Sequence, residues 1–310
     1  MRLGVKISTP KRKVARGKEI QLSTVIPSRV NGRLDLHFKY SAQTQQTQLQ
    51  IITQTPPMRV IRAFQLADGA ALAHVHNVSG GVLGGDKLEL TVTVEAEAKG
   101  QLTTPSATRV YRHREGMAVA CQYTVIDIGA NGLLEYLPDP LIPFAQARYQ
   151  QTTHIQLAEG AGLFWWEMVA PGREAKQEFF AYDWLETRVD IWAKQRPIAL
   201  ERQRLCPHEQ SPTSLIRLGR YGYYTTFYIC RVGETAATWT ALEQELAQLA
   251  QEQNYPGQTM WGVSSLVADG LVVRGLGQAG RDLMSGLVAF WRLAKRRLYG
   301  AEVELPRKMY

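Results

Sequence analysis

The chain has 310 residues, of which 45% are hydrophobic and 21% are charged, and it carries a formal net charge of +8. These values are typical of folded globular proteins and exclude general disorder. A chain of this length buries about three quarters of its unfolded surface, which is enough for one large domain or two smaller ones.

The apolar segments and the cysteines indicate a cellular compartment. No apolar run approaches the roughly 20 residues that cross a bilayer, and residues 1–6 lack the apolar stretch of an export signal. Cys121, Cys206 and Cys230 are few, odd in number and far apart, which favours reduced thiols over a disulfide framework. We therefore expect a cytoplasmic protein that has no membrane partner.

The positive charge is concentrated at residues 11–18, 292–297 and 307–308. Such clusters form solvated faces or contact acidic protein partners. No nucleic-acid-binding motif accompanies them, so we expect no nucleic-acid partner. Residues 1–28 are predicted to be a basic N-terminal extension, and residues 29–310 to form one β domain that includes the C-terminal helix and tail.

Alternating apolar and polar residues predict strands throughout this domain. Residues 33–38 and 48–52 alternate, prolines at 56 and 57 interrupt the sheet, and the alternation resumes from residue 71 to residue 232 with glycine and proline turns. Helical patterns occupy residues 238–253 and 278–299. The prediction is a mainly β protein of stacked, largely antiparallel sheets in a single elongated domain, with two α-helices in its C-terminal quarter.

The turn at residues 80–86, Gly-Gly-Val-Leu-Gly-Gly-Asp, is the most constrained stretch of the chain. Its glycines suit positive φ angles or the close approach of another backbone. A phosphate-binding loop opens a helix, whereas a strand follows here, so we do not expect phosphate binding. We expect Asp86 to accept backbone N–H bonds within the turn, and the alternative is a carboxylate that lines a polar channel.

No pattern predicts catalysis or a tight metal site. The two serines on the predicted strand 261–266 lack a nucleophile elbow. His74 and His76 share a strand face, and His208 follows Cys206 in a predicted loop, but neither pair reaches the four ligands of a tetrahedral site. We expect no enzymatic activity and no tightly bound cofactor.

Several short motifs follow one another between Gly32 and Arg307. They are Pro-Pro-Met-Arg at 56–59, the turn at 80–86, Thr-Thr-Pro-x-Ala-Thr-x-x-Tyr-Arg at 103–112 and Leu-Pro-Arg at 305–307. In this order and spacing, the motifs resemble those of the urease accessory protein family UreD, also called UreH. The matching positions expected to be structural are Gly80, Gly81, Gly84, Gly85, Thr104, Pro105, Tyr111, Arg112, Pro138, Gly172 and Arg173.

The resemblance implies a mostly β protein without catalytic activity that binds the urease apoenzyme. With UreF and the GTPase UreG, such a protein helps to deliver nickel to the urease active site. It implies that Ni²⁺ passes transiently through a water-filled tunnel and is not held as a cofactor. The candidate residues for the nickel path are Asp86, Glu135, Glu167 and Glu178, and those for partner binding are Trp291, Arg296, Arg297 and Arg307.

Two of these acids lie in apolar strands, where an unpaired buried carboxylate costs several kcal/mol. Glu135 and Glu167 therefore lie on wet faces, pair with residues such as Arg173 and Arg188, or line an internal water path. Labile oxygen ligands and water suit the transit of Ni²⁺ better than imidazole or thiolate cages, which hold it too tightly.

Two other classes of protein fit the same residues. In a β-rich carbohydrate-active enzyme, Glu135 and Glu167 would be paired acids about 5–10 Å apart across an open cleft. A carbohydrate- or nucleic-acid-binding module would instead show an exposed aromatic or basic groove.

Overall fold

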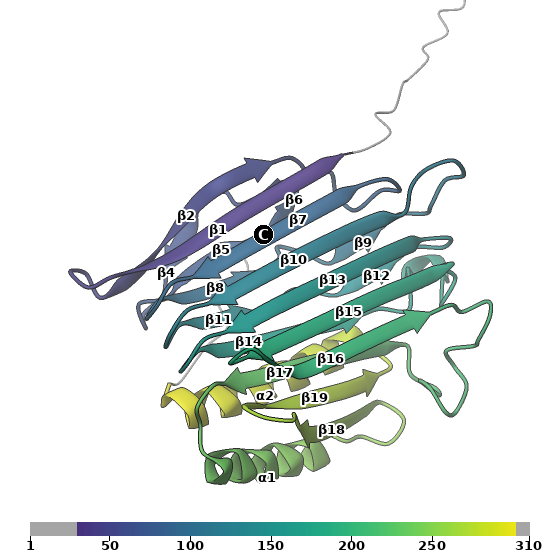
Figure 1. Cartoon of the computed structure of the whole chain (residues 1–310). Coiled ribbons are helices and arrows are strands. Elements are labelled where there is room, and N and C mark those ends of the chain that lie inside the picture. Colours follow the sequence, from purple (N-terminus) through teal and green to yellow (C-terminus); the bar gives the residue numbers. More distant parts are fainter. Residues whose placement is uncertain (1–29, 302–310) are drawn as a thin grey trace, which may run out of the picture.

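The structure is a computed structural model that describes residues 30–301, and Figure 1 shows its two stacked sheets and its helices. The predicted basic extension at residues 1–28 and the partner-binding candidate Arg307 lie outside the described residues. The division of the chain at residue 28 stays a prediction.

The first sheet has seven strands and faces the viewer in Figure 1. In their order across the sheet, they are β16 (Arg196–Leu205), β15 (Trp184–Ala193), β13 (Arg148–Leu157), β10 (Ala120–Ile128), β7 (Lys87–Val94), β1 (Asn31–Ser41) and β2 (Gln46–Thr55).

The second sheet has ten strands and lies behind the first. Its main path is β18 (Thr259–Ser265), β19 (Gly270–Gly277), β17 (Tyr223–Arg231), β14 (Gly162–Val169), β11 (Leu133–Tyr136), β8 (Lys99–Thr103), β5 (Ala71–His74) and β4 (Ala63–Gln65). The short strands β12 (Leu141–Pro143) and β9 (Thr108–Val110) extend it, and β3 (Met58–Arg59) pairs with β6 (His76–Asn77) in a separate ribbon.

Strand direction differs from the sequence prediction. Strands β1, β7, β10, β13 and β15 are mutually parallel, as are β5, β8, β11 and β14, while antiparallel pairs lie toward the sheet edges. The expectation of largely antiparallel sheets is therefore wrong for the middle of both sheets. The turns after β7, β10 and β13 carry the chain to the opposite sheet. The chain thus winds in coils, each with one strand in each sheet, and the corresponding strands of successive coils run in the same direction.

These turns stack on one another along the coil. Glu97, Asn131 and Gly160 occupy corresponding corners and have φ angles of 62°, 55° and 70°. The first two backbone N–H groups donate to a carbonyl of the next corner, at 3.0 Å for Glu97 to Ala130 and 3.0 Å for Asn131 to Glu159, and the Gly160 N–H donates at 3.2 Å to Val232 in the turn after β17. The stacked corners hold the coils in register.

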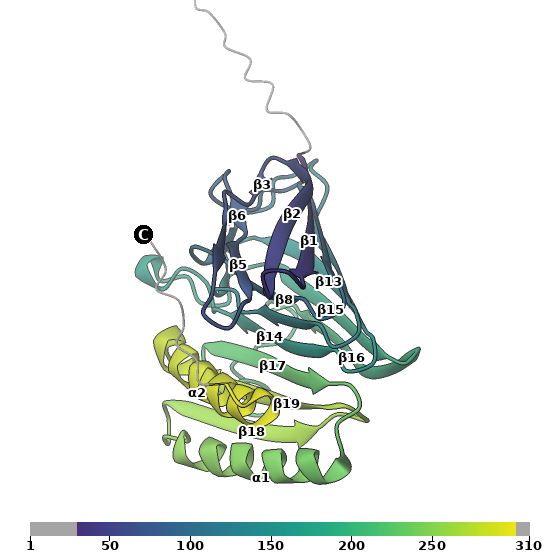
Figure 2. The same ribbon diagram turned by 90° about the vertical axis from the view of Figure 1, so that its left-hand side faces the viewer.

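Apolar side chains form two cores, one on each side of the second sheet. The core between the sheets includes Phe38, Val92 and Ile155, all fully buried. The second core lies between this sheet and the two helices, α1 (Ala236–Glu252) and α2 (Gly280–Tyr299), which Figure 2 shows on the face away from the first sheet. A short 3₁₀ helix (Glu174–Lys176) follows β14. The mainly β fold with stacked sheets and two helices confirms that part of the prediction.

An ion pair joins α2 to the second sheet. Glu135 on β11 points toward the helix, accepts a hydrogen bond from the Trp291 indole at 2.8 Å and pairs with the Lys295 ammonium group. Lys295 also lies 3.4 Å from Asp68, and both Glu135 and Lys295 are only 2% exposed. A buried lysine is tolerated here because these carboxylates neutralise it.

Gly160→Ala is expected to reduce the free energy of unfolding by about 1–3 kcal/mol, because alanine is strained at positive φ. A β-carbon at this position would also lie 2.0 Å from the Asn131 side-chain oxygen. Chemical denaturation measures the loss. Gly262→Ala is the control: no atom lies within 4 Å of its β-carbon position, so we expect a change within about 0.5 kcal/mol. If both substitutions change the free energy of unfolding equally, the corner at Gly160 has no special requirement for glycine.

Glu135→Gln is expected to destabilise the fold by about 3 kcal/mol, because Lys295 is then buried without its main counter-ion. Adding Lys295→Met should recover most of this loss, since no uncompensated charge remains. Thermal unfolding of the single and double variants measures both effects. Additive losses in the double variant would show that the pair does not act as a unit.

Candidate functional site

A row of polar side chains crosses the inner face of the first sheet. Gln122 on β10 is level with Gln151 on β13, which is level with Thr187 on β15 and Gln203 on β16. The next row contains Thr124, Thr153, Val189 and Glu201. Inward positions of a sandwich normally hold apolar residues, so these rows mark a polar interior.

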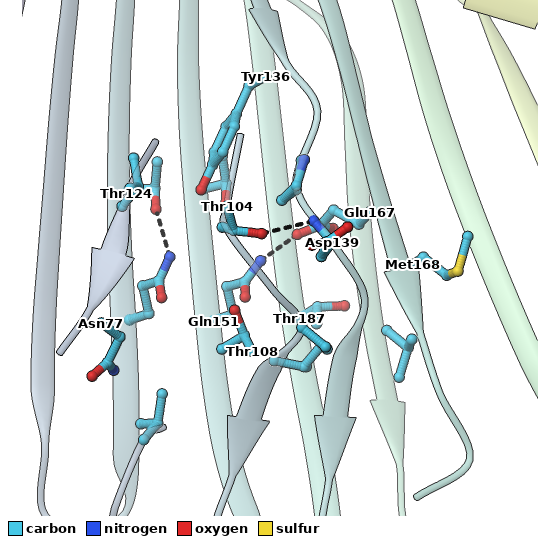
Figure 3. Close-up of a pocket in the computed structure, with 18 of the residues that line it drawn as sticks. Asn77, Thr104, Thr108, Thr124, Tyr136, Asp139, Gln151, Glu167, Met168 and Thr187 are labelled. Atoms are coloured by element: carbon cyan, nitrogen blue, oxygen red, sulfur yellow. Dashed lines mark hydrogen bonds between the residues drawn. The ribbon is translucent and has the colours of Figure 1, made fainter. Parts of the chain in front are cut away.

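The polar rows line a cavity of about 170 Å³ between the sheets, shown in Figure 3. Tyr136, Glu167, Tyr224, Thr226 and Tyr228 of the second sheet form the opposite wall. This volume holds several water molecules, given that one water needs roughly 10–15 Å³ of such space. The buried Tyr224 hydroxyl has no protein hydrogen-bond partner, which is typical of a group that binds water.

Glu167 is the carboxylate at the centre of this wall. Its side chain accepts a hydrogen bond from the Gln151 amide, so the two residues connect the sheets across the cavity (Figure 3). Burial, together with the negative charge of Glu201, raises the pKa of the Glu167 carboxyl from 4.5 to about 7, against the opposing effect of the Gln151 hydrogen bond. Near neutral pH, this carboxyl exchanges a proton readily.

Two of the sequence motifs meet at one end of the cavity. The Val82 backbone N–H donates to Arg109 at 2.7 Å, and the Tyr111 N–H donates to Val82 at 2.8 Å, so residues 80–86 and 103–112 are joined. Gly81 is required there, because a β-carbon would lie 2.5 Å from the Tyr111 ring. Thr104 accepts the Asp139 backbone N–H at 2.9 Å and holds a third segment beside them.

Asp86 stabilises the turn, as the sequence predicts. Its carboxylate accepts the Leu83 backbone N–H at 2.8 Å, and only 3% of the residue is exposed. Burial raises the pKa of the Asp86 carboxyl, although the Leu83 hydrogen bond opposes this effect. Asp86 is not one of the cavity-lining residues.

The other two acids predicted for a nickel path also lie away from the cavity wall. Glu135 faces α2, on the opposite side of the second sheet from Glu167. Glu178 accepts the Arg173 guanidinium N–H at 2.8 Å and the Ala145 backbone N–H at 3.1 Å, and the Arg173 hydrogen bond lowers the pKa of the Glu178 carboxyl. The structure thus brings none of the four predicted acids together, and their roles stay predictions.

The expected arginine partners of the buried acids are bound elsewhere. Arg173 pairs with Glu178, and Arg188 pairs with Asp190 at 3.0 Å. Lys295 is the partner of Glu135, whereas Glu167 lines the water-sized cavity. Of the alternatives left open for these acids, a cationic partner applies to Glu135 and an internal cavity to Glu167.

Sequence reasoning missed most of the polar residues of the cavity, including Gln151, Glu201 and Asp139. Gln151 and Glu201 lie at inward positions of β13 and β16, and Asp139 follows the motif residue Pro138. Inward-facing Gln and Thr on consecutive strands were the available signal, but their alignment depends on the parallel register.

The partner-binding candidates on α2 differ in exposure. Trp291 is fully buried against the sheet, so it positions the helix and does not itself present a contact surface. Arg297 is 58% exposed and pairs with Glu245 of α1 at 2.7 Å, and Arg296 is exposed.

The histidines and cysteines form no metal cage. His74 and His76 have ring centroids 6.4 Å apart, and His74 also packs edge-on against Phe64. Within residues 30–301, no group of three or more His, Cys, Asp or Glu side chains is placed to hold a metal ion. Neither described helix has the length and apolarity required to cross a membrane.

The Glu167 pKa predicts a pH dependence of stability. Between pH 4.5 and about 7, the folded state retains a proton that the unfolded state releases, so stability falls as the pH rises. Relative to Glu167→Gln, the native chain should lose about 1–3 kcal/mol of unfolding free energy across this range. Denaturation of both proteins at several pH values measures the difference. A constant difference across this range would contradict the raised pKa.

Comparison with known proteins identifies the family. Residues 30–310 match the family described as "UreD urease accessory protein". The urease accessory protein UreD of Herpetosiphon aurantiacus is 48% identical over 91% of this chain and 97% of its own length. UreD 1 of Psychrobacter cryohalolentis is 31% identical over 66% of this chain and 68% of its own, and UreD of Halalkalibacterium halodurans is 30% identical over 83% and 91%. The chain therefore belongs to the UreD family of urease accessory proteins, which implies a role in urease maturation.

Proposed function

We propose that the chain is a non-catalytic scaffold that binds the urease apoenzyme and, with UreF and the GTPase UreG, helps to deliver nickel to the urease active site. Ni²⁺ passes through the cavity between the two sheets and is not retained. The observation that carries the proposal is the polar cavity, with Glu167 on its wall, inside a member of the UreD family.

The chemistry of the lining supports transit over storage. Hydroxyl and amide groups of Gln151, Thr153, Thr187 and Gln203 face the cavity together with the Glu167 carboxylate. Oxygen ligands and water bind Ni²⁺ more weakly than imidazole or thiolate ligands, so the ion can leave again. A cavity that holds several waters also spares the ion complete dehydration.

The protonation of Glu167 supports weak binding as well. Because the pKa of this carboxyl is raised to about 7, a cation must displace a proton at neutral pH. This competition lowers the apparent affinity and makes binding stronger as the pH rises. Ni²⁺ is therefore released more easily than from a permanently ionised carboxylate.

The alternative of a carbohydrate-active enzyme has less support. Paired catalytic acids must face each other across one cleft. Glu135 bonds to α2 and Glu167 bonds to the first sheet, so the two carboxyl groups lie on opposite sides of the second sheet. A binding module with an aromatic groove is not favoured either, since Tyr136, Tyr149 and Tyr228 of the cavity are all buried.

The proposal places partner contacts on the outer side of α2. Arg296 and Arg297 are exposed there, Arg297 beside its partner Glu245, and an acidic surface of a partner can meet this face while the buried Trp291 keeps the helix in place. The three free thiols are in keeping with a cytoplasmic protein.

Glu167→Gln is expected to slow urease activation on the order of tenfold, because the cavity loses its central cation ligand while its shape is kept. The measurement is the rate of urease activation in a purified mixture of this chain, UreF, UreG, the urease apoenzyme and nickel.

Glu186→Gln is the matched control, because Glu186 is a carboxylate on the outer face of β15, away from the cavity. It should activate urease at the native rate. If a folded Glu167→Gln variant matches this control at every pH tested, the cavity is not the path of the ion. Copurification of the variant with UreF and the apoenzyme shows whether partner binding is kept. If it is kept, slower activation reflects the loss of nickel transit.

A further inference from the structure

At one side of the sandwich, the first sheet ends while the second sheet continues. Strand β16 is the last strand of the first sheet, whereas the second sheet continues through β17, β19 and β18 (Figure 2). Among residues 30–301, the first sheet has no strand beyond β16 at this side. The cavity reaches this side, because Glu201 and Gln203 of β16 belong to its wall.

A cluster of three side chains joins the two sheets at this side. Glu201 on β16 accepts a hydrogen bond from the Arg274 guanidinium of β19 at 2.6 Å. The same carboxylate oxygen accepts the Tyr228 hydroxyl of β17 at 2.7 Å. Glu201 thus connects the edge of the first sheet to two strands of the second.

Exposure decreases from the solvent toward the cavity along this cluster. The Arg274 side chain is 62% exposed, the Glu201 side chain is 27% exposed and Tyr228 is 2% exposed. Arg274 therefore lies on the solvent side and Tyr228 on the cavity side, with the shared carboxylate between them.

Neighbouring ion pairs on β16 have a different geometry. Arg202 pairs with Asp190 at 2.7 Å, and Arg204 lies 3.8 Å from Glu186, and both acids belong to β15 of the same sheet. These pairs support one sheet, whereas Glu201 and Arg274 join two sheets that have no backbone pairing with each other here.

We propose that the Glu201–Arg274 pair is a latch that closes the side of the cavity and confines a cation to it. The pair holds β16 against β19, and its guanidinium group repels a divalent cation from the gap. The closure depends on the geometry alone, and the confinement of Ni²⁺ rests on the function proposed above.

The latch also prevents Glu201 from trapping the cation. With Arg274 in place, the Glu201 carboxylate is paired with a guanidinium group, and the oxygen that bonds to it also accepts the Tyr228 hydroxyl. The charge of Glu201 already acts on the Glu167 carboxyl, whose pKa it raises, so without Arg274 the cavity would hold two acids with no cationic partner. Two ionised acids in one cavity bind a divalent cation more tightly than one acid and slow its release.

Solvent access to the cavity tests the closure without nickel or partners. Thr226 lies opposite Glu167 in the strand register and lines the cavity, so Thr226→Cys places a thiol there. Cys121→Ser removes the partly exposed native thiol, and Cys206→Ser removes the thiol that Arg204 contacts at 3.4 Å, while Cys230 is buried. The rate of modification by a small methanethiosulfonate reagent then reports access to the cavity.

Arg274→Ala should raise this rate about three- to fivefold, the effect expected when an ion pair that restrains local opening is lost. Arg204→Ala is the matched control, since Arg204 is 60% exposed and its ion pair stays within the first sheet. Arg274→Lys should restore part of the protection, and Arg274→Gln replaces the alanine variant if that one aggregates. If the modification rate does not increase, or increases equally with Arg204→Ala, the Glu201–Arg274 pair does not close the cavity.

Urease activation in the presence of a nickel chelator tests the confinement. Arg274→Ala should activate urease more slowly than the Arg204→Ala control, and added chelator should widen the gap, because ions escape or are captured through the open side. If labelling increases but chelator sensitivity is unchanged, the pair closes the cavity without confining a cation, and the proposal fails in that part. Failure of the proposed function appears separately, as native activation by Glu167→Gln.

Discussion

The parallel register between strands one coil apart is the constraint on which the rest of the structure depends. Each coil passes from the first sheet to the second through a tight corner, and the corners at Glu97, Asn131 and Gly160 are bonded to one another. Because side chains alternate between faces, a slip of one residue would turn every inward side chain outward. The corner bonds therefore determine which residues line the interior.

This register divides the interior into a polar part and an apolar part. On β10, the inward positions run from Gln122 and Thr124 to Ile126 and Ile128, and β13 follows the same order from Gln151 and Thr153 to Ile155 and Leu157. The apolar half packs as a core and supplies the burial that stabilises the sandwich. The polar half cannot close without leaving hydroxyl and amide groups unsatisfied, so it stays open to water.

Alternation along the second sheet also gives Glu135 and Glu167 different environments. Glu135 faces the helices, where it pairs with Lys295 and accepts the Trp291 indole N–H. Glu167 faces the cavity, where it has an amide neighbour and a nearby negative charge. A carboxyl without a fixed cation is the one that can accept a passing cation, which links the packing of the sheet to the proposed function.

The sequence by itself determined the mainly β class, the two late helices, the turn role of Asp86 and the family, because each depends on local pattern or on motif order. Strand direction could not be read from it, since alternation defines the faces of a strand and not the neighbour with which it pairs. Only the tertiary structure decided that Glu135 and Glu167 point to opposite sides, that the motifs at 80–86 and 103–112 meet, and that Gln151 and Glu201 share a cavity. These residues are brought together by long-range pairing between coils, and that pairing leaves no short-range signal in the chain.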